Sequence, residues 1–141
     1  MYLRTMGGTG ASPVGGKFYI VKDGVINPDI IASGASYTYD AVNGRLTVSP
    51  DSVNRYLNFS PSLTVSGYIN LKATIMSTSA ANYAELTAKV DGNSIAPMRF
   101  DTANVKTTLT SAINGDTMTN LSVVTVSNYA NFYLYDLWIE Q

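Results

Sequence analysis

The side chains best suited to binding chemistry in this chain are aromatic: its 141 residues include ten tyrosines and one tryptophan. An exposed aromatic ring can stack on a sugar ring while neighbouring amide and carboxylate groups bond the sugar hydroxyls. Five tyrosines lie at solvent-facing strand positions or in turns, and these are the candidate carbohydrate-binding residues: Tyr37, Tyr39, Tyr68, Tyr83 and Tyr129. Tyrosine is also common in strands and at protein–protein contacts, so a structural role stays open.

Catalytic groups are scarce. The chain has neither Cys nor His, which excludes disulfides, the usual zinc sites, thiol nucleophiles and imidazole triads. Of the two glutamates, Glu85 is expected in a cross-strand charge pair with Lys72 or Lys89. Asp136 interrupts an apolar strand face, and we expect its carboxylate to accept a hydrogen bond from a loop amide rather than to catalyse. The sequence therefore predicts no enzyme, no catalytic residue and no cofactor.

Loops and charges also argue against phosphate, metal and nucleic acid as ligands. Gly16-Lys17 is followed by Phe18 where a phosphate-binding loop needs Ser or Thr. The acidic turns at 91–93 and 101–104 lack the spacing of a calcium loop, so we expect ordinary turn chemistry and no metal. Nine basic and ten acidic residues give a net charge of −1, which offers no footprint for nucleic acid or an anionic membrane.

The composition divides the chain into an arm and one domain. Residues 1–17 hold five of the eleven glycines and no apolar periodicity, so we expect a flexible N-terminal arm followed by a domain over 18–141. The alternative is an arm that docks on a neighbouring subunit, with Tyr2, Leu3 and Met6 as its anchors.

After residue 17, turn signals recur every eight to twelve residues, which is typical of all-β proteins. The predicted strands cover residues 18–21, 37–42, 45–49, 56–59, 68–76, 83–90, 95–100, 105–109, 121–126 and 132–140. Asn43-Gly44 predicts a type I′ hairpin turn. Apolar and polar residues alternate in 68–76 and 83–90, as in half-buried antiparallel strands, and this parity places Tyr68 and Tyr83 on the polar side.

The last strand, 132–140, is apolar on both faces. Tyr133, Tyr135, Leu137 and Ile139 share one parity, whereas Phe132, Leu134 and Trp138 share the other. A strand of this kind is covered on both sides, by loops over a central strand, by the arm or by a partner subunit. Tyr133, Tyr135 and Trp138 are therefore candidate subunit contacts. Short strands, frequent turns and no convincing helix predict an all-β, antiparallel two-sheet β-sandwich, with a jelly roll as the expected topology.

Three stretches resemble a known group of domains. Residues 56–60 lead into the corner Leu63-Thr64-Val65-Ser66-Gly67-Tyr68 and an alternating strand, a pattern similar to small jelly-roll domains of phage tail and baseplate proteins and to related carbohydrate-binding modules. Residues 133–140 resemble their terminal strand, and residues 18–24 resemble the first strand of small virion proteins. The resemblance implies adjacent first and last strands and a protein assembled on a virus particle.

These observations give two hypotheses for function. Only 13 % of the residues are charged while 41 of 141 are Ser, Thr or Asn, a surface suited to packed assemblies. With the resemblance, this predicts a non-enzymatic structural component of a phage virion, in the tail, baseplate or capsid decoration. Its partners would be other virion proteins in a homo-oligomer, on a particle assembled in the host cytoplasm. The alternative is a carbohydrate-binding module that attaches to a host cell-surface glycan.

Overall fold

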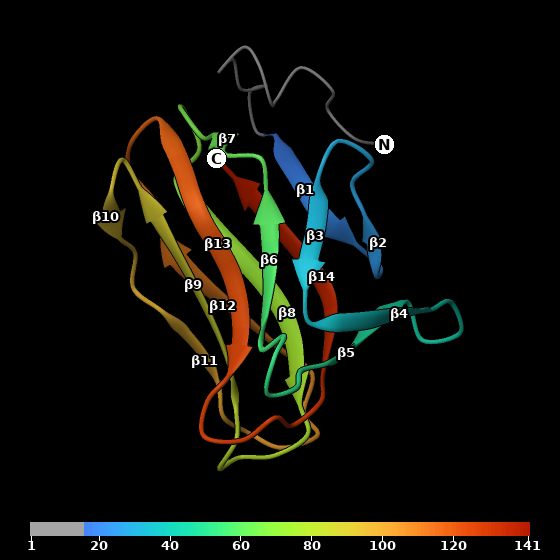
Figure 1. The fold of residues 1–141 in the computed structure, drawn as a ribbon. Coiled ribbons are helices and arrows are strands. Elements are labelled where there is room, and N and C mark those ends of the chain that lie inside the picture. Colours follow the sequence, from blue (N-terminus) through green and yellow to red (C-terminus); the bar gives the residue numbers. More distant parts are fainter. Residues whose placement is uncertain (1–15) are drawn as a thin grey trace.

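The computed structural model describes residues 16–141, which form two antiparallel β-sheets packed face to face (Figure 1). Sheet A contains β1 (Lys17–Lys22), β2 (Val25–Ile26), β4 (Ser36–Asp40), β5 (Arg45–Ser49), β8 (Asn70–Ser77), β12 (Thr107–Ala112) and β14 (Phe132–Glu140). Sheet B contains β3 (Ile31–Gly34), β6 (Tyr56–Ser60), β7 (Leu63–Thr64), β9 (Ala84–Val90), β10 (Asn93–Ser94), β11 (Met98–Phe100) and β13 (Thr117–Thr125). No helix occurs in this part of the chain, so the predicted all-β sandwich is confirmed.

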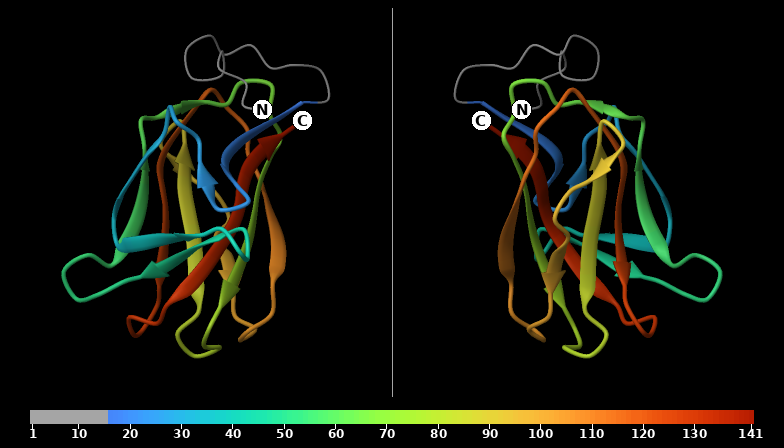
Figure 2. Two further views of the ribbon diagram at one scale, coloured as in Figure 1. Left: turned by 90° about the vertical axis from the view of Figure 1, so that its right-hand side faces the viewer. Right: turned by 90° about the vertical axis from the view of Figure 1, so that its left-hand side faces the viewer.

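The two sheets have different strand orders. Sheet A runs β12-β8-β14-β1-β2, while β5 pairs with the first residues of β14 and carries β4 at its far side. Sheet B runs β10-β9-β13-β6-β3, with β11 on β9 and β7 on β13. The first and last strands are therefore neighbours, as the resemblance implied, and Figure 2 shows β1 and β14 side by side in both views.

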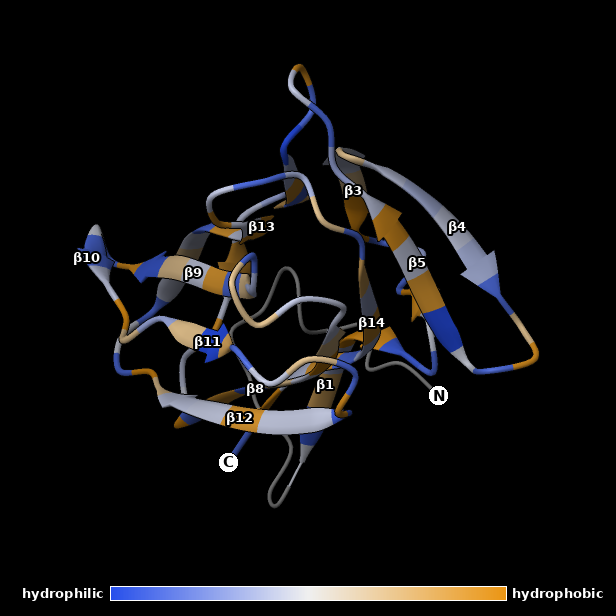
Figure 3. Ribbon diagram, turned by 90° about the horizontal axis from the view of Figure 1, so that it is seen from below, coloured by the Kyte–Doolittle hydropathy of each residue, from blue (hydrophilic) through white to orange (hydrophobic). Residues whose placement is uncertain are grey.

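The core lies between the sheets and follows the alternation of the sequence. In β9 the four residues Ala84, Leu86, Ala88 and Val90 are buried, as predicted. Leu71, Ala73 and Ile75 of β8 pack against them from the opposite sheet. Figure 3 shows the same alternation as apolar and polar bands along β5. Each large aliphatic side chain buried in this way contributes roughly 1.5–3 kcal/mol of transfer free energy.

The predicted face assignment of the last strand is wrong because β14 contains a bulge. Leu134 pairs with Ile75 of β8, whereas Asp136 pairs with Thr74, so Tyr135 has no partner in that register. An extra residue in one strand shifts the parity of all that follow. The core side of β14 is consequently Phe132, Leu134, Leu137 and Ile139, while Tyr133 and Trp138 share the outer side. The strand is central, with β8 on one side and β1 and β5 on the other.

The β4–β5 hairpin exists as predicted, but its turn is different. Asp40 pairs with Arg45, which leaves a loop of residues 41–44 in place of a two-residue type I′ turn. Only Gly44 has a positive φ, of 62°. The Asp40 carboxylate accepts hydrogen bonds from the backbone N–H (3.1 Å) and Nδ2 (2.8 Å) of Asn43, and the side-chain bond to Asn43 is the main cause of its lowered pKa. These bonds favour the longer loop.

The predictions for the N-terminal arm fall mainly outside the described residues. Tyr2, Leu3 and Met6 are among residues 1–15, so both the flexible arm and its docking stay predictions. Strand β1 starts at Lys17, and the division into an arm over 1–17 and a domain over 18–141 stays a prediction. Across 16–141, no helix long and apolar enough to cross a membrane is present.

Asp136 has the anchoring role expected from the sequence. Its Oδ1 accepts a hydrogen bond of 2.8 Å from the backbone N–H of Asp23, in the β1–β2 turn. The N–H of the next residue, Gly24, donates to the carbonyl of Tyr135 at 2.8 Å. The carboxylate and the bulge therefore fix this turn against β14.

We predict that Asp136→Ala lowers the free energy of unfolding by about 1–2 kcal/mol, because the Asp23 N–H loses a charged acceptor. Asp136→Asn keeps an amide oxygen and should lose less. Denaturant unfolding of the three proteins measures both values. An Asp136→Ala protein as stable as the parent would contradict the anchoring role.

Candidate functional site

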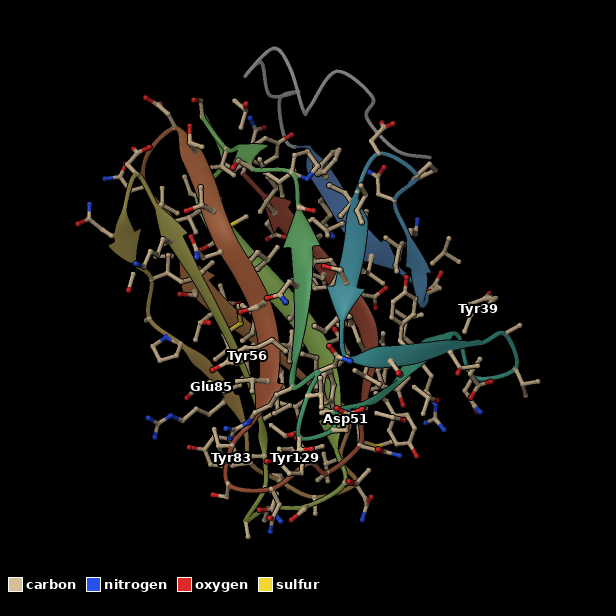
Figure 4. All side chains as sticks on the ribbon, viewed as in Figure 1. Tyr39, Asp51, Tyr56, Tyr83, Glu85 and Tyr129 are labelled. Carbon is tan, nitrogen blue, oxygen red and sulfur yellow. The ribbon has the colours of Figure 1, made fainter. Side chains whose placement is uncertain are left out.

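Three tyrosines lie together on the outer side of sheet B, and we call Tyr56, Tyr83 and Tyr129 the tyrosine face (Figure 4). Tyr56 is 48 % exposed and Tyr129 is 47 % exposed, while Tyr83 is half-buried. The orientation of Tyr56 follows from β6, in which Leu57 and Phe59 enter the core. Because side chains alternate along a strand, Tyr56 must point to solvent.

Strand register places an acidic residue beside these rings. Val124 of β13 pairs with Tyr56 on one side and with Glu85 of β9 on the other. Strands are about 4.8 Å apart, so Tyr56 and Glu85 lie about 10 Å from each other across Val124. Tyr83 precedes Glu85 by two residues, about 7 Å along the same strand direction. The three side chains thus surround one patch of the sheet around Val124.

Two arginines lie beside rings of the tyrosine face. Arg99 of β11 pairs with Glu85, Nε to Oε2 3.0 Å, and its guanidinium lies 5.9 Å from the ring centroid of Tyr83. Arg55 donates from Nε and from its terminal nitrogen to the carbonyl of Thr125, and lies 5.9 Å from the ring of Tyr129. The predicted pairing of Glu85 with Lys72 or Lys89 is wrong, since Arg99 stands directly opposite on the neighbouring strand.

A polar row continues the surface beyond the tyrosines. Ser122 of β13 pairs with Asn58 of β6 and with Thr87 of β9, so two hydroxyls and an amide lie in one line across the sheet. Lys89 follows Thr87 on the same side. A hollow of about 240 Å³ lies here, between Thr87, Lys89, Ser94, Asn120 and Ser122. These side chains supply hydrogen-bond donors and acceptors of the kinds that bond sugar hydroxyls.

A backbone hydrogen bond holds Tyr56 on the side of β3, and a side-chain bond orders the loop before β6. The Tyr56 carbonyl accepts the N–H of Ala35 at 2.8 Å, just beyond Gly34, whose φ is +98°. A Cβ at Gly34 would overlap the Tyr56 carbonyl oxygen, so the close approach of β3 to β6 requires glycine. In the loop before β6, Asp51 Oδ1 accepts the N–H groups of Asn54 (2.7 Å) and Val53 (2.8 Å), which lower the pKa of Asp51.

Comparison with known proteins adds a fold relationship. No protein-family model matches the chain, and no curated protein sequence matches it. A tyrosine mutant of a family 29 carbohydrate-binding module superposes with a TM-score of 0.61 at 12 % identity, covering 88 % of this chain and 91 % of that one.

Two further structures superpose on this chain to a similar extent. A family 29 module from Piromyces equi gives a TM-score of 0.56 at 12 % identity, over 88 % of this chain and 89 % of that chain. A lysine mutant of such a module, in complex with cellulohexaose, gives 0.59 at 10 % identity over the same shares of the two chains. The fold resembles that of family 29 carbohydrate-binding modules. At these identities the likeness shows the fold alone.

The structure separates the five tyrosines predicted from the sequence. Tyr83 and Tyr129 belong to the tyrosine face, whereas Tyr68 is only 3 % exposed, so its predicted outward orientation is wrong. Strand β8 begins at Asn70, and Tyr68 instead closes a turn in which its N–H donates to the carbonyl of Val65. The strand parity that predicted an outward ring therefore does not apply.

Tyr37 and Tyr39 are exposed but lie elsewhere. They pair with Val48 and Leu46 across the β4–β5 hairpin in sheet A, and Figure 4 shows Tyr39 far from the tyrosine face. Tyr56, in contrast, belongs to the face and was missed by the sequence analysis. Its signal was present in the alternation of residues 56–60, which buries Leu57 and Phe59.

The outer side of sheet A carries the predicted subunit contacts, and its aromatic rings already have intramolecular partners. The Trp138 and Tyr19 centroids are 5.7 Å apart, with the Lys17 and Lys22 ammonium groups over these two rings. The Arg45 guanidinium lies 3.7 Å from the ring centroid of Tyr133.

Tyr135 is the most enclosed ring on this side. Arg45 donates to its hydroxyl at 3.0 Å, and the Lys106 ammonium lies 4.3 Å from its ring centroid. Subunit contacts at Tyr133, Tyr135 and Trp138 stay a prediction.

We predict that Gly34→Ala destabilises the protein by more than Gly92→Ala. Both residues have a positive φ, so both substitutions introduce about 1 kcal/mol or more of backbone strain. A Cβ at Gly92 meets nothing within 4 Å, whereas one at Gly34 overlaps the backbone beneath Tyr56. Denaturant unfolding of both variants measures the difference, and equal losses would contradict a required close approach of β3.

We also predict that the fluorescence of the single tryptophan, Trp138, changes at acid pH. Trp138 Nε1 donates to Glu140 Oε1 at 2.7 Å, and this bond, followed by Lys72 at 3.1 Å, lowers the pKa of Glu140 below its ordinary 4.5. A lowered folded pKa contributes stability above pH 4.5 that is lost as pH falls through the folded value. Tryptophan fluorescence should therefore change below pH 4.5, and not in Glu140→Gln. A Glu140→Gln protein whose fluorescence changes with pH as that of the parent does would contradict the assignment.

Proposed function

We propose that this chain is a non-enzymatic carbohydrate-binding module that binds an oligosaccharide on the outer side of sheet B. The observation that carries the proposal is the tyrosine face: three neighbouring rings, two of them nearly half exposed, continued by hydroxyl, amide and charged groups. Rings of this kind stack on the apolar faces of sugars, and the polar row bonds their hydroxyls.

The structural neighbours support this proposal. They are family 29 carbohydrate-binding modules, one of them in complex with cellulohexaose and another with mannohexaose. The mutants made to study ligand recognition in one such module change a tyrosine, lysines and aspartates. Aromatic and charged side chains also adjoin on the tyrosine face of this chain, where Glu85 and Arg99 lie beside Tyr83.

The dimensions of the surface favour an oligosaccharide over a single sugar. From Glu85 to Lys89 along β9 the strand advances about 14 Å, and Tyr83 adds a further 7 Å. A ligand in contact with both the tyrosines and the polar row must therefore contain several rings. We expect affinity to rise with chain length until this distance is covered.

The phage hypothesis receives no support from these neighbours. A β-sandwich serves equally in a virion and in a glycan-binding module, so the fold does not separate the two functions. Other virion proteins as partners, a homo-oligomer and a location on the particle stay predictions. The glycan-binding alternative has the better support.

We predict that Tyr56→Ala and Tyr83→Ala each weaken hexasaccharide binding at least about tenfold, because each removes a stacking ring. Titration calorimetry with cellohexaose and mannohexaose measures the affinity. Tyr39→Ala is the matched control, since this ring is 51 % exposed but lies on β4 in sheet A. Equal loss in the control, or unchanged binding in both face variants, would contradict the proposed site.

A further inference from the structure

A hollow of about 360 Å³ lies where β6 and β13 of sheet B separate. The two strands pair regularly as far as Asn58 and Ser122. Beyond this point β13 bulges between Thr119 and Ser122, with Asn120 at a φ of 56°. Strand β6 ends at Ser60, and on this edge β13 regains a partner only where β7 begins, while its other edge stays paired with β9 at Thr119 and Met118. The sheet is therefore open between its two central strands.

The lining of this hollow is neutral. Its floor is apolar and includes Leu63, Met118 and Leu121, all of them core residues at most 4 % exposed. Its rim carries the hydroxyls of Ser60, Ser62 and Thr119 and the amide of Asn120. No ionisable side chain lines it. A carboxylate or phosphate would lose its water there without gaining a cation, so the hollow favours a neutral group.

The hollow is continuous with the proposed binding surface. Asn120 lines both this hollow and the neighbouring one formed by Thr87, Lys89 and Ser122. Along β6, Ser60 lies four residues from Tyr56, or about 14 Å. An oligosaccharide stacked on the tyrosine face therefore reaches the rim with its next rings.

We propose that this hollow binds an acetyl group carried by the bound oligosaccharide, an inference that rests on the proposed function. An acetyl group has a methyl end that fits the apolar floor and a carbonyl oxygen that accepts from the rim hydroxyls or the Asn120 amide. An unsubstituted sugar leaves that floor unfilled. The acetyl group can come from an N-acetyl sugar or from an O-acetylated one.

The test is calorimetry of the full chain with two matched ligand pairs. Chitohexaose against cellohexaose tests the N-acetyl source, and O-acetylated against deacetylated mannohexaose tests the O-acetyl source. We expect the acetylated member of at least one pair to bind about five- to tenfold tighter, from a buried methyl and one hydrogen bond.

A variant that fills the hollow with a side chain tests whether the acetyl preference arises there. Ser62→Tyr places a ring in the hollow from an exposed loop position and should remove the acetyl preference while leaving cellohexaose affinity unchanged. Thr119→Tyr serves the same purpose if Ser62→Tyr fails to fold. Ser36→Tyr, exposed on β4 of sheet A, is the control and should keep the preference.

The outcomes separate the two proposals. Binding of cellohexaose or mannohexaose without any acetyl preference overturns the acetyl site and leaves the proposed function intact. An acetyl preference that survives Ser62→Tyr and Thr119→Tyr, or a filling variant that weakens all hexasaccharides equally, also overturns it. No binding of any of the four ligands overturns the proposed function and the acetyl site together.

Discussion

The alternation of side chains across sheet B is the constraint on which the candidate site depends. Burying Leu57 and Phe59 in the core leaves Tyr56 no direction except outward, and burying Ala84 and Leu86 does the same for Glu85. The apolar contacts that stabilise the sandwich therefore also orient the side chains of the candidate site. A one-residue slip in the pairing of β6 would turn Leu57 and Phe59 to solvent and Tyr56 to the core. The core and the candidate site would therefore be lost together.

The two sheets differ in how their outer aromatic rings are used. On sheet A, Trp138 bonds Glu140, and Arg45 covers Tyr133 while bonding Tyr135. These rings contribute contacts between β1 and β14 and between β5 and β14. On sheet B, Tyr56 and Tyr129 keep nearly half of their surface in solvent. The proposed binding module needs accessible rings on a rigid sheet, and within residues 16–141 the outer side of sheet B places such rings beside a polar row.

The sequence was sufficient for the fold class and for part of the site. Alternation in residues 84–90 is a local property, so that strand and the outward position of Tyr83 could be predicted. The buried position of Tyr68 could not be predicted, because the residue at which a strand begins depends on the strands it pairs with. The bulge at Tyr135 and the pairing of Glu85 with Arg99 arise from register between distant strands, and two-residue strands such as β10 carry no pattern.

The central claim is that sheet B, and not sheet A, is the ligand surface. Titration of the isotope-labelled protein with cellohexaose or mannohexaose, followed by backbone amide chemical shifts, tests it most directly. We expect shifts concentrated in β6, β9 and β13 and in the loop of Tyr129, with β1, β8 and β14 unaffected. Shifts concentrated on the outer side of sheet A or on the β4–β5 hairpin, or none at saturating ligand, would contradict it.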